Sequence, residues 1–200
     1  MSATDPHPSG SAAHDPRAGD APAVPEPDDK DWTWVLERTC PECGFDAAAL
    51  PRAELLATAG ALARTWAGLL REGGAELRVR PAPAVWSPAE YGCHVRDVYA
   101  RTTARVAAML SGDDPVFENW DQDATAIADR YWEQDPAVVA GALLARAADL
   151  DATARPGGAD LDDAGWRRPG QRSNGSRFTV ESLLRYTLHD VAHHLHDVGA

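Results

Sequence analysis

Apolar residues recur at helical spacing in four long segments of this chain. Within each segment a leucine, valine or alanine returns every third or fourth residue, which is the pattern of a helix with one buried face. No convincing strand alternation and no internal repeat accompanies them. The predicted helices cover residues 51–72, 87–111, 135–154 and 179–198. Four helices of about 20 residues favour an all-α fold, a four-helix bundle.

The ends of these helices carry recognisable stop and start signals. Gly73 and Gly74 end the first helix. Ser87, followed by a proline and then by Glu90, forms the capping box that begins the second helix. Thr179 is a good N-cap for the fourth helix. The acidic connection 113–134 is rich in aromatic residues, so we expect it to pack on the bundle, with a short helix near 124–131.

The chain divides by composition into three parts. Residues 1–30 are rich in Pro, Ala, Asp, Gly and Ser and have almost no large apolar side chain, which predicts a disordered tail. Residues 31–49 form an N-terminal extension with two tryptophans and a Cys-x2-Cys motif. Residues 50–200 hold the predicted bundle.

Composition and charge exclude some classes of protein. The 200 residues are 44% hydrophobic, enough for a core, and no apolar run is long enough to span a membrane. The net charge of −12 argues against a nucleic-acid partner, whose binding surfaces are basic. Three cysteines and no visible export signal favour reduced thiols in the cytoplasm.

Histidines supply the candidate chemistry, since four of the seven lie in the last dozen residues. His189 and His193 are four positions apart, so they lie about 40° apart on one helix face, where two imidazoles can bind one metal ion. His94 in the second helix is the natural third ligand if the helices pack together. Three imidazoles suit Zn²⁺, Ni²⁺, Fe²⁺ or Co²⁺ and leave one position open. Core histidines or a solvated helix end remain the alternatives.

The three cysteines have several possible roles. Cys40 and Cys43 resemble one knuckle of a zinc ribbon, which Cys93 or a histidine near the C-terminus would have to complete. A redox pair and a buried thiol pair are the alternatives. Cys93 lies about 100° around its helix from His94, which favours a packing role for it.

Two segments carry a family resemblance. Residues 85–97, Val-Trp-Ser-Pro-Ala-Glu-Tyr-Gly-Cys-His-Val-Arg-Asp, and the closing helix from Phe178 through His189, His193 and Asp197 resemble the DinB family. This family of metal-binding four-helix bundles includes the N-terminal domain of mycothiol-dependent maleylpyruvate isomerase. The resemblance spans about residues 50–198.

The resemblance implies a metal triad of His94, His189 and His193, with Zn or Ni as the ion. It also implies activation of a thiol cosubstrate such as mycothiol or bacillithiol, in an S-transferase or an isomerase. The single lysine, with abundant Ala, Gly and Asp, is typical of a high-GC bacterial genome, which favours mycothiol. Many bundles of this family are homodimers.

Arginines near the predicted triad could bind a carboxylate of the cofactor or substrate. Arg101 and Arg105 share the side of His94, and Arg185 shares that of His189. Surface ion pairing is the alternative role for all three. For the whole protein the alternatives are a metal-dependent hydrolase and a non-catalytic stress protein that binds a metal or another ligand.

Overall fold

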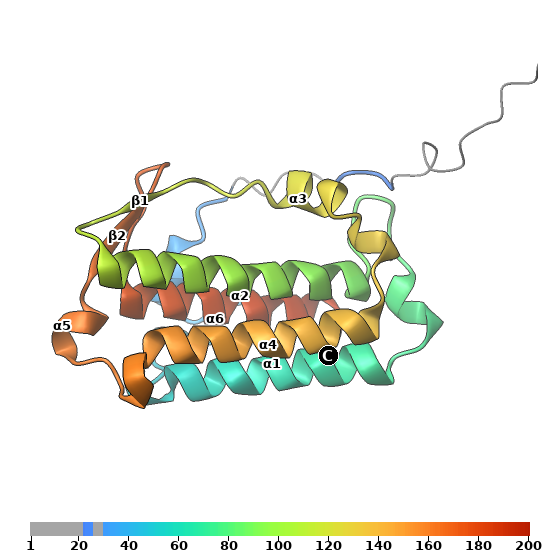
Figure 1. Cartoon of the computed structure of the whole chain (residues 1–200). Coiled ribbons are helices and arrows are strands. Elements are labelled where there is room, and N and C mark those ends of the chain that lie inside the picture. Colours follow the sequence, from blue (N-terminus) through green and yellow to red (C-terminus); the bar gives the residue numbers. More distant parts are fainter. Residues whose placement is uncertain (1–21, 26–29) are drawn as a thin grey trace, which may run out of the picture.

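The computed structural model describes residues 22–25 and 30–200, and it is a four-helix bundle (Figure 1). The bundle helices are α1 (Leu55–Glu72), α2 (Pro88–Ser111), α4 (Pro136–Ala154) and α6 (Val180–Asp197). The predicted all-α fold is therefore confirmed, with helix ends within a few residues of those expected. Most of the predicted disordered tail, residues 1–30, lies outside the described residues.

The remaining elements are short. Two are α-helical, α3 (Gln122–Ala128) and α5 (Asp163–Trp166). The 3-10 helices are η1 (Thr33–Leu36), η2 (Arg52–Glu54), η3 (Ala75–Arg78), η4 (Tyr131–Glu133) and η5 (Pro156–Gly158). The strands are β1 (Val116–Phe117), β2 (Pro169–Arg172) and β3 (Arg177–Thr179).

Helix α2 begins at the capping box that the sequence predicts. The Ser87 hydroxyl accepts a hydrogen bond from the Glu90 backbone, and the Glu90 carboxylate accepts one of 2.9 Å from the Ser87 backbone. Glu90 is buried, and its charge is balanced by Arg80, whose Nε donates to it over 2.8 Å. These contacts fix the N-terminal turn of α2, one turn before His94.

Helix α2 packs against α4 and α6, and α1 packs against the same two helices, so the diagonal pairs, α1 with α2 and α4 with α6, have the least contact across the bundle. Trp66, Tyr99 and Leu188 are among the fully buried core residues. The Trp66 indole donates to the Val191 carbonyl over 3.1 Å, and the Tyr99 hydroxyl donates to the Ala59 carbonyl over 2.7 Å. The polar ends of these large side chains are therefore satisfied within the core.

A small sheet closes one end of the bundle, although no strand pattern was visible in the sequence. β1 pairs in parallel with β2, and β2 pairs antiparallel with β3. Strands of two to four residues are too short to show a recognisable alternation. A Cβ atom on Gly170 would overlap the Phe117 ring and lie 2.8 Å from Cγ of Met109, so β2 approaches α2 closely only because this residue is glycine.

The N-terminal extension lies along α6. Its 3-10 helix η1 contacts α6, and Val35 and Cys40 are buried. Arg185 of α6 holds the end of the extension, because its guanidinium donates to the carbonyl oxygens of Ala47 and Leu50. Within residues 22–25 and 30–200, no helix has the length and apolar character needed to cross a membrane.

Candidate metal centres

Helix α6 presents two interleaved pairs of possible metal ligands. Asp190 and His194 form the first pair, with four-residue spacing. His189 and His193 form the second pair, each one position earlier in the sequence. Because successive residues are turned by about 100°, the two pairs face different neighbours. In the described part of the chain, His94 lies beside the first pair, Asp190 and His194. Cys40 and Cys43 lie beside the second pair, His189 and His193.

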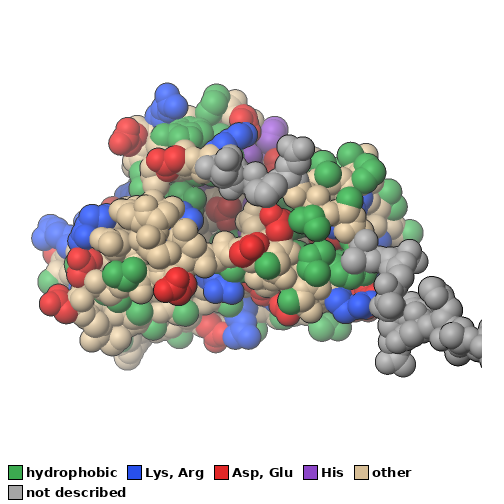
Figure 2. All heavy atoms as spheres, turned by 90° about the horizontal axis from the view of Figure 1, so that it is seen from above, with side chains coloured by type: hydrophobic (Ala, Val, Ile, Leu, Met, Phe, Trp, Pro, Cys, Tyr) green, Lys and Arg blue, Asp and Glu red, His purple; other side chains and the backbone are tan. Residues whose placement is uncertain are grey.

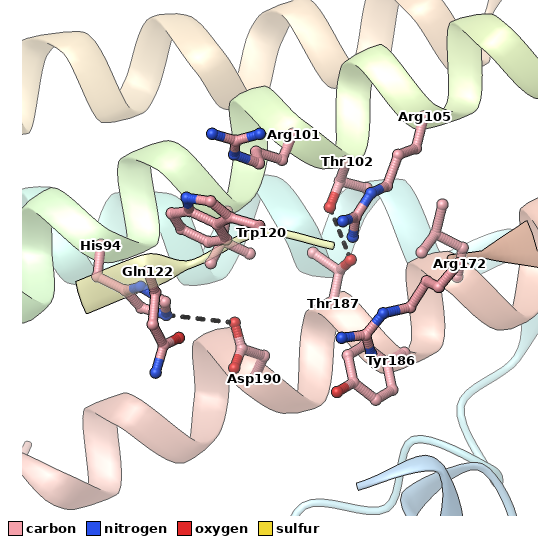
Figure 3. Close-up of a pocket in the computed structure, with 12 residues that line it drawn as sticks. His94, Arg101, Thr102, Arg105, Trp120, Gln122, Arg172, Tyr186, Thr187 and Asp190 are labelled. Carbon is pink, nitrogen blue, oxygen red and sulfur yellow. Dashed lines mark hydrogen bonds and ion pairs between the residues drawn. The ribbon is translucent and has the colours of Figure 1, made fainter. Parts of the chain in front are cut away.

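The first candidate centre consists of His94, Asp190 and His194. One possible ligand atom from each residue lies within 4.8 Å of the others. Asp190 Oδ2 is 3.8 Å from His94 Nε2, and Asp190 Oδ1 is 3.5 Å from His194 Nε2. The two imidazole ring centroids are 4.9 Å apart. Helices α2 and α6 thus bring two imidazoles and a carboxylate together. Figure 3 shows two members of this group, His94 and Asp190.

His94 is buried, and neither of its ring nitrogens has a hydrogen-bond partner among the described residues. Its ring stacks on Trp120 with centroids 5.2 Å apart and planes 4° from parallel. Burial lowers the pKa of His94, so the imidazole is held neutral, the form that binds metal. A buried imidazole that makes no hydrogen bond is costly, and a bound cation would satisfy its ring nitrogen. Two imidazoles and one carboxylate therefore fit a divalent metal such as Zn²⁺, Ni²⁺ or Fe²⁺.

The carboxylates around His194 set its orientation and charge. His194 Nδ1 bonds to Asp197 Oδ2 over 2.8 Å, which leaves Nε2 directed toward Asp190. Burial opposes protonation of His194, but Asp190 and Asp197 outweigh it and raise its pKa to about 9. Burial likewise opposes ionisation of Asp190, yet His194 and His94 hold the pKa of its carboxyl well below its usual range. Asp197 is thus placed to orient a ligand imidazole.

A cavity of about 110 Å³ adjoins His94 and Asp190 (Figure 3). Three arginines line it: Arg101, Arg105 and Arg172. Burial and the positive charges of Arg172 and Arg101 lower the pKa of Arg105 to about 10. Three guanidinium groups so close together repel one another, and an anion bound between them would relieve that repulsion.

A larger open groove of about 1240 Å³ runs past the same residues. Trp32, Tyr91 and Trp120 are among its aromatic walls, and Asp190 and His194 face it. Seen from above, histidine side chains reach the surface of this face among acidic and basic groups (Figure 2). The candidate centre is therefore accessible to a molecule larger than the cavity beside it.

The second candidate centre consists of Cys40, Cys43, His189 and His193. One donor atom from each of these residues lies within 4.8 Å of the others. Cys40, His189 and His193 are buried, Cys43 is half-buried, and all three cysteines of the chain are free thiols.

The predicted ligands His94, His189 and His193 are thus divided between two groups instead of forming one. Asp190 and His194 were not among the predicted ligands, although their four-residue spacing was visible in the sequence. Periodicity gives the spacing of a ligand pair but not which of two adjacent pairs faces α2. Which residues bind an ion stays a prediction that metal analysis must test.

Of the other residues predicted for the site, some lie beside His94 and others do not. Arg101 lines the cavity beside His94, but Arg185 does not: its donors are engaged by the extension and by Glu181, 2.8 Å away. These contacts agree with the alternative role of ion pairing, and the cofactor-binding role of Arg185 stays a prediction. Arg172 was missed because it lies on a strand far away in the sequence. Cys93 is buried beside the Tyr131 carbonyl, in keeping with its predicted packing role, and burial raises its pKa to about 12.

Comparison with known proteins defines the class of this bundle. Residues 54–198 match the model of the DinB superfamily, so the chain belongs to that superfamily. Among solved structures it is similar to YfiT from Bacillus subtilis, described as a probable metal-dependent hydrolase with an unusual four-helix bundle topology. The TM-score is 0.63 at 17% sequence identity, covering 72% of this chain and 82% of YfiT, a likeness that concerns the fold. No curated protein sequence matches the chain.

Proposed function

We propose that this protein is a metal-dependent enzyme that joins a low-molecular-weight thiol, such as mycothiol, to a small anionic substrate or isomerises that substrate with the thiol's help. One observation carries the proposal. A three-donor centre of His94, Asp190 and His194 adjoins a cavity lined by three arginines.

His94, Asp190 and His194 would hold the ion, with Zn²⁺ and Ni²⁺ as the leading candidates. Three protein ligands are typical of catalytic metal sites, which keep a position free, whereas structural sites use four. A divalent cation bound there would lower the pKa of a coordinated thiol or water and supply a nucleophile near neutral pH. Asp197 would keep the His194 ring oriented through its 2.8 Å contact with Nδ1.

The arginines would bind and orient the substrate. Guanidinium groups bind carboxylates through paired, charge-assisted hydrogen bonds, so Arg101, Arg105 and Arg172 favour a substrate with one or two carboxylates. The face of Trp120 forms a flat apolar wall beside His94. The groove exceeds the range of about 300–1,000 Å³ usual for small-molecule sites, which leaves room for a thiol cosubstrate as well.

Hydrolysis is the second candidate function. YfiT is described as a probable metal-dependent hydrolase, and the three-donor centre of this chain could present water instead of a thiol. Turnover without any thiol distinguishes this function from the first. A non-catalytic metal-binding protein would show metal binding and no turnover.

The test compares His94→Ala with His196→Ala in the full chain. His196 is exposed on the same helix as the ligands and belongs to neither candidate centre, so its loss controls for removal of an imidazole. Each variant is loaded with Zn²⁺ or Ni²⁺, and metal content is measured. Carboxylate-bearing electrophiles are then supplied with and without mycothiol, and carboxylic esters without thiol.

We expect His94→Ala to lose one metal equivalent and all thiol-dependent turnover, while His196→Ala keeps both. Arg105→Ala should raise KM for the anionic substrate more than it lowers kcat. The proposal fails if His94→Ala keeps its full metal content, if the wild type turns over only esters without thiol, or if it turns over nothing.

A further inference from the structure

The sequence Cys40-Pro-Glu-Cys43-Gly44 forms a tight loop whose two thiols face the same way. The Gly44 amide donates to the Cys40 carbonyl over 2.9 Å, and the Cys40 amide donates to the Phe45 carbonyl over 3.0 Å. Gly44 has a φ of 73°, a left-handed conformation that closes the turn and that residues with a Cβ adopt rarely. Cys40 and Cys43 are thereby brought beside His189 and His193.

The distances in this group suit tetrahedral coordination. Cys40 Sγ is 3.7 Å from His193 Nδ1. Bond lengths of about 2.3 Å to sulfur and 2.05 Å to nitrogen place such atoms about 3.6 Å apart around a tetrahedral zinc ion. The spacings C-x2-C and H-x3-H are also those of structural zinc sites with two cysteines and two histidines.

The histidines are arranged as metal ligands usually are. While Nδ1 of His193 faces Cys40, Nε2 lies 3.4 Å from Glu42 Oε2 and 3.6 Å from Asp197 Oδ1. A carboxylate on the far nitrogen fixes the tautomer that leaves the near nitrogen free to bind metal. His189 is 4% exposed, and its buried Nε2 has no hydrogen-bond partner among the described residues.

Aromatic rings shield this group from the solvent. The Trp32 ring centroid lies 5.7 Å from that of His189 and 5.2 Å from that of His193. Trp34 packs edge-on to His189 at 6.3 Å. Both tryptophans belong to the extension, so the group joins the extension to α6.

We propose that Cys40, Cys43, His189 and His193 bind one zinc ion in a closed, four-ligand site that fastens the N-terminal extension to α6. Binding releases two protons, one from each thiol, and leaves the ion with two thiolate and two neutral imidazole ligands. Both cysteines precede residue 54, where the superfamily match begins, so half of the site lies outside the shared fold. A closed ligand set predicts a structural role.

The site also shapes the open groove. Trp32, His189 and His193 line this groove, which passes the separate centre at His94. Loss of zinc would free the extension and remove the Trp32 wall. The zinc site would therefore influence substrate binding without supplying a reactive group.

The experiment measures zinc and cobalt in the full chain, for the wild type and for Cys40→Ser, Cys43→Ser, Cys93→Ser and His94→Ala. Cys93 is the matched control, since it is a buried thiol outside both groups. Cobalt bound through thiolates in a tetrahedral site gives a near-ultraviolet charge-transfer band and intense visible bands. In addition, an organomercurial reagent is titrated into the folded wild type while zinc release is followed with a coloured chelator.

We expect Cys40→Ser and Cys43→Ser each to lose one zinc equivalent and the charge-transfer band. Cys93→Ser and His94→Ala should keep the band, which separates this site from the one at His94. The serine variants could fail to fold, so the titration of the folded wild type gives a second test. Release of one zinc ion as the organomercurial reagent modifies two thiols supports the site. The proposal is overturned if the wild type holds no thiolate-bound metal, or if a Cys40–Cys43 disulfide forms in the purified protein while zinc content is unchanged.

Discussion

Glu90→Gln is predicted to destabilise the bundle strongly. The substitution keeps the size of the side chain but removes the charge that balances Arg80. The carboxylate accepts hydrogen bonds from Arg80 Nε over 2.8 Å, from the Ser87 backbone over 2.9 Å and from the Ser87 hydroxyl over 2.8 Å. Its side chain is 2% exposed and that of Arg80 is 13% exposed.

The size of the effect follows from this burial. Removing one partner of a buried ion pair costs about 3–5 kcal/mol, because the other charge remains without compensation. Arg80 keeps hydrogen bonds to the carbonyl oxygens of Ala23 and Pro83, so we expect the lower end, about 3 kcal/mol. For a chain of this size that is a fall in Tm of about 6–12 °C.

The effect should depend on pH in a defined direction. Burial acts to raise the pKa of Glu90, but hydrogen bonds from Arg80 and Ser87 outweigh it and lower the pKa below its ordinary value. A lowered pKa in the folded state stabilises the protein fully above the unfolded value of about 4.3, and this contribution is lost as the pH falls through the folded value. The difference between wild type and Glu90→Gln should therefore be largest near neutral pH and shrink in acid.

The assay is urea unfolding at neutral and acid pH, with Glu133→Gln as the matched control. Glu133 is paired with Arg130, but both side chains are about half exposed, so its loss should cost less than about 1 kcal/mol. If Glu90→Gln costs no more than Glu133→Gln at neutral pH, the ion pair does not stabilise the start of α2 as argued.

Three other changes test packing, hydrogen bonding and the zinc site. Gly170→Ala should cost about 1–3 kcal/mol by crowding the core, whereas Gly141→Ala, in open space on α4, should stabilise by about 0.5–1 kcal/mol. Thr187→Val should cost about 1–3 kcal/mol because it leaves the buried Thr102 hydroxyl without its 2.8 Å partner. Chelation of zinc should lower Tm and make residues 31–49 susceptible to a protease.

Each of these has a measurement that would contradict it. Denaturant unfolding of Gly170→Ala and Gly141→Ala tests the packing prediction. Equal changes in the free energy of unfolding would contradict the close approach of β2 to α2. A double variant, Thr102→Val with Thr187→Val, should recover most of the stability lost in Thr187→Val. No recovery would contradict the hydrogen-bonding prediction. Protease cleavage within residues 31–49 at the same rate with and without chelator would contradict the prediction that zinc fastens this segment to α6.

The sequence predicted the bundle well because each helix carried its own local signals. The capping box at Ser87 and the N-cap at Thr179 determine where α2 and α6 begin, and both are present in the structure. The small sheet could not be predicted, since β1 and β2 are brought together by packing across more than fifty residues and not by a pattern within either strand.

The candidate centres were predicted only in part, for a related reason. His94 and the histidine-rich stretch of α6 stood out by composition. Which face of α6 meets α2 depends on how the helices pack, so Asp190 and His194 were not distinguished from their neighbours. The pairing of Cys40 and Cys43 with the other face depends on the path of the extension, which local sequence does not record.

Because the two pairs of possible ligands on α6 are offset by one residue, the rotation of α6 about its own axis determines which pair faces His94 and which faces Cys40 and Cys43. One extra residue inserted between Thr179 and His189 would turn the following stretch by about 100° and move His189 and His193 into the places of Asp190 and His194. His94 would then face two histidines, whereas Cys40 and Cys43 would face Leu188 and Ala192. A single inserted codon would thus replace the two candidate ligand sets with one candidate set of three histidines.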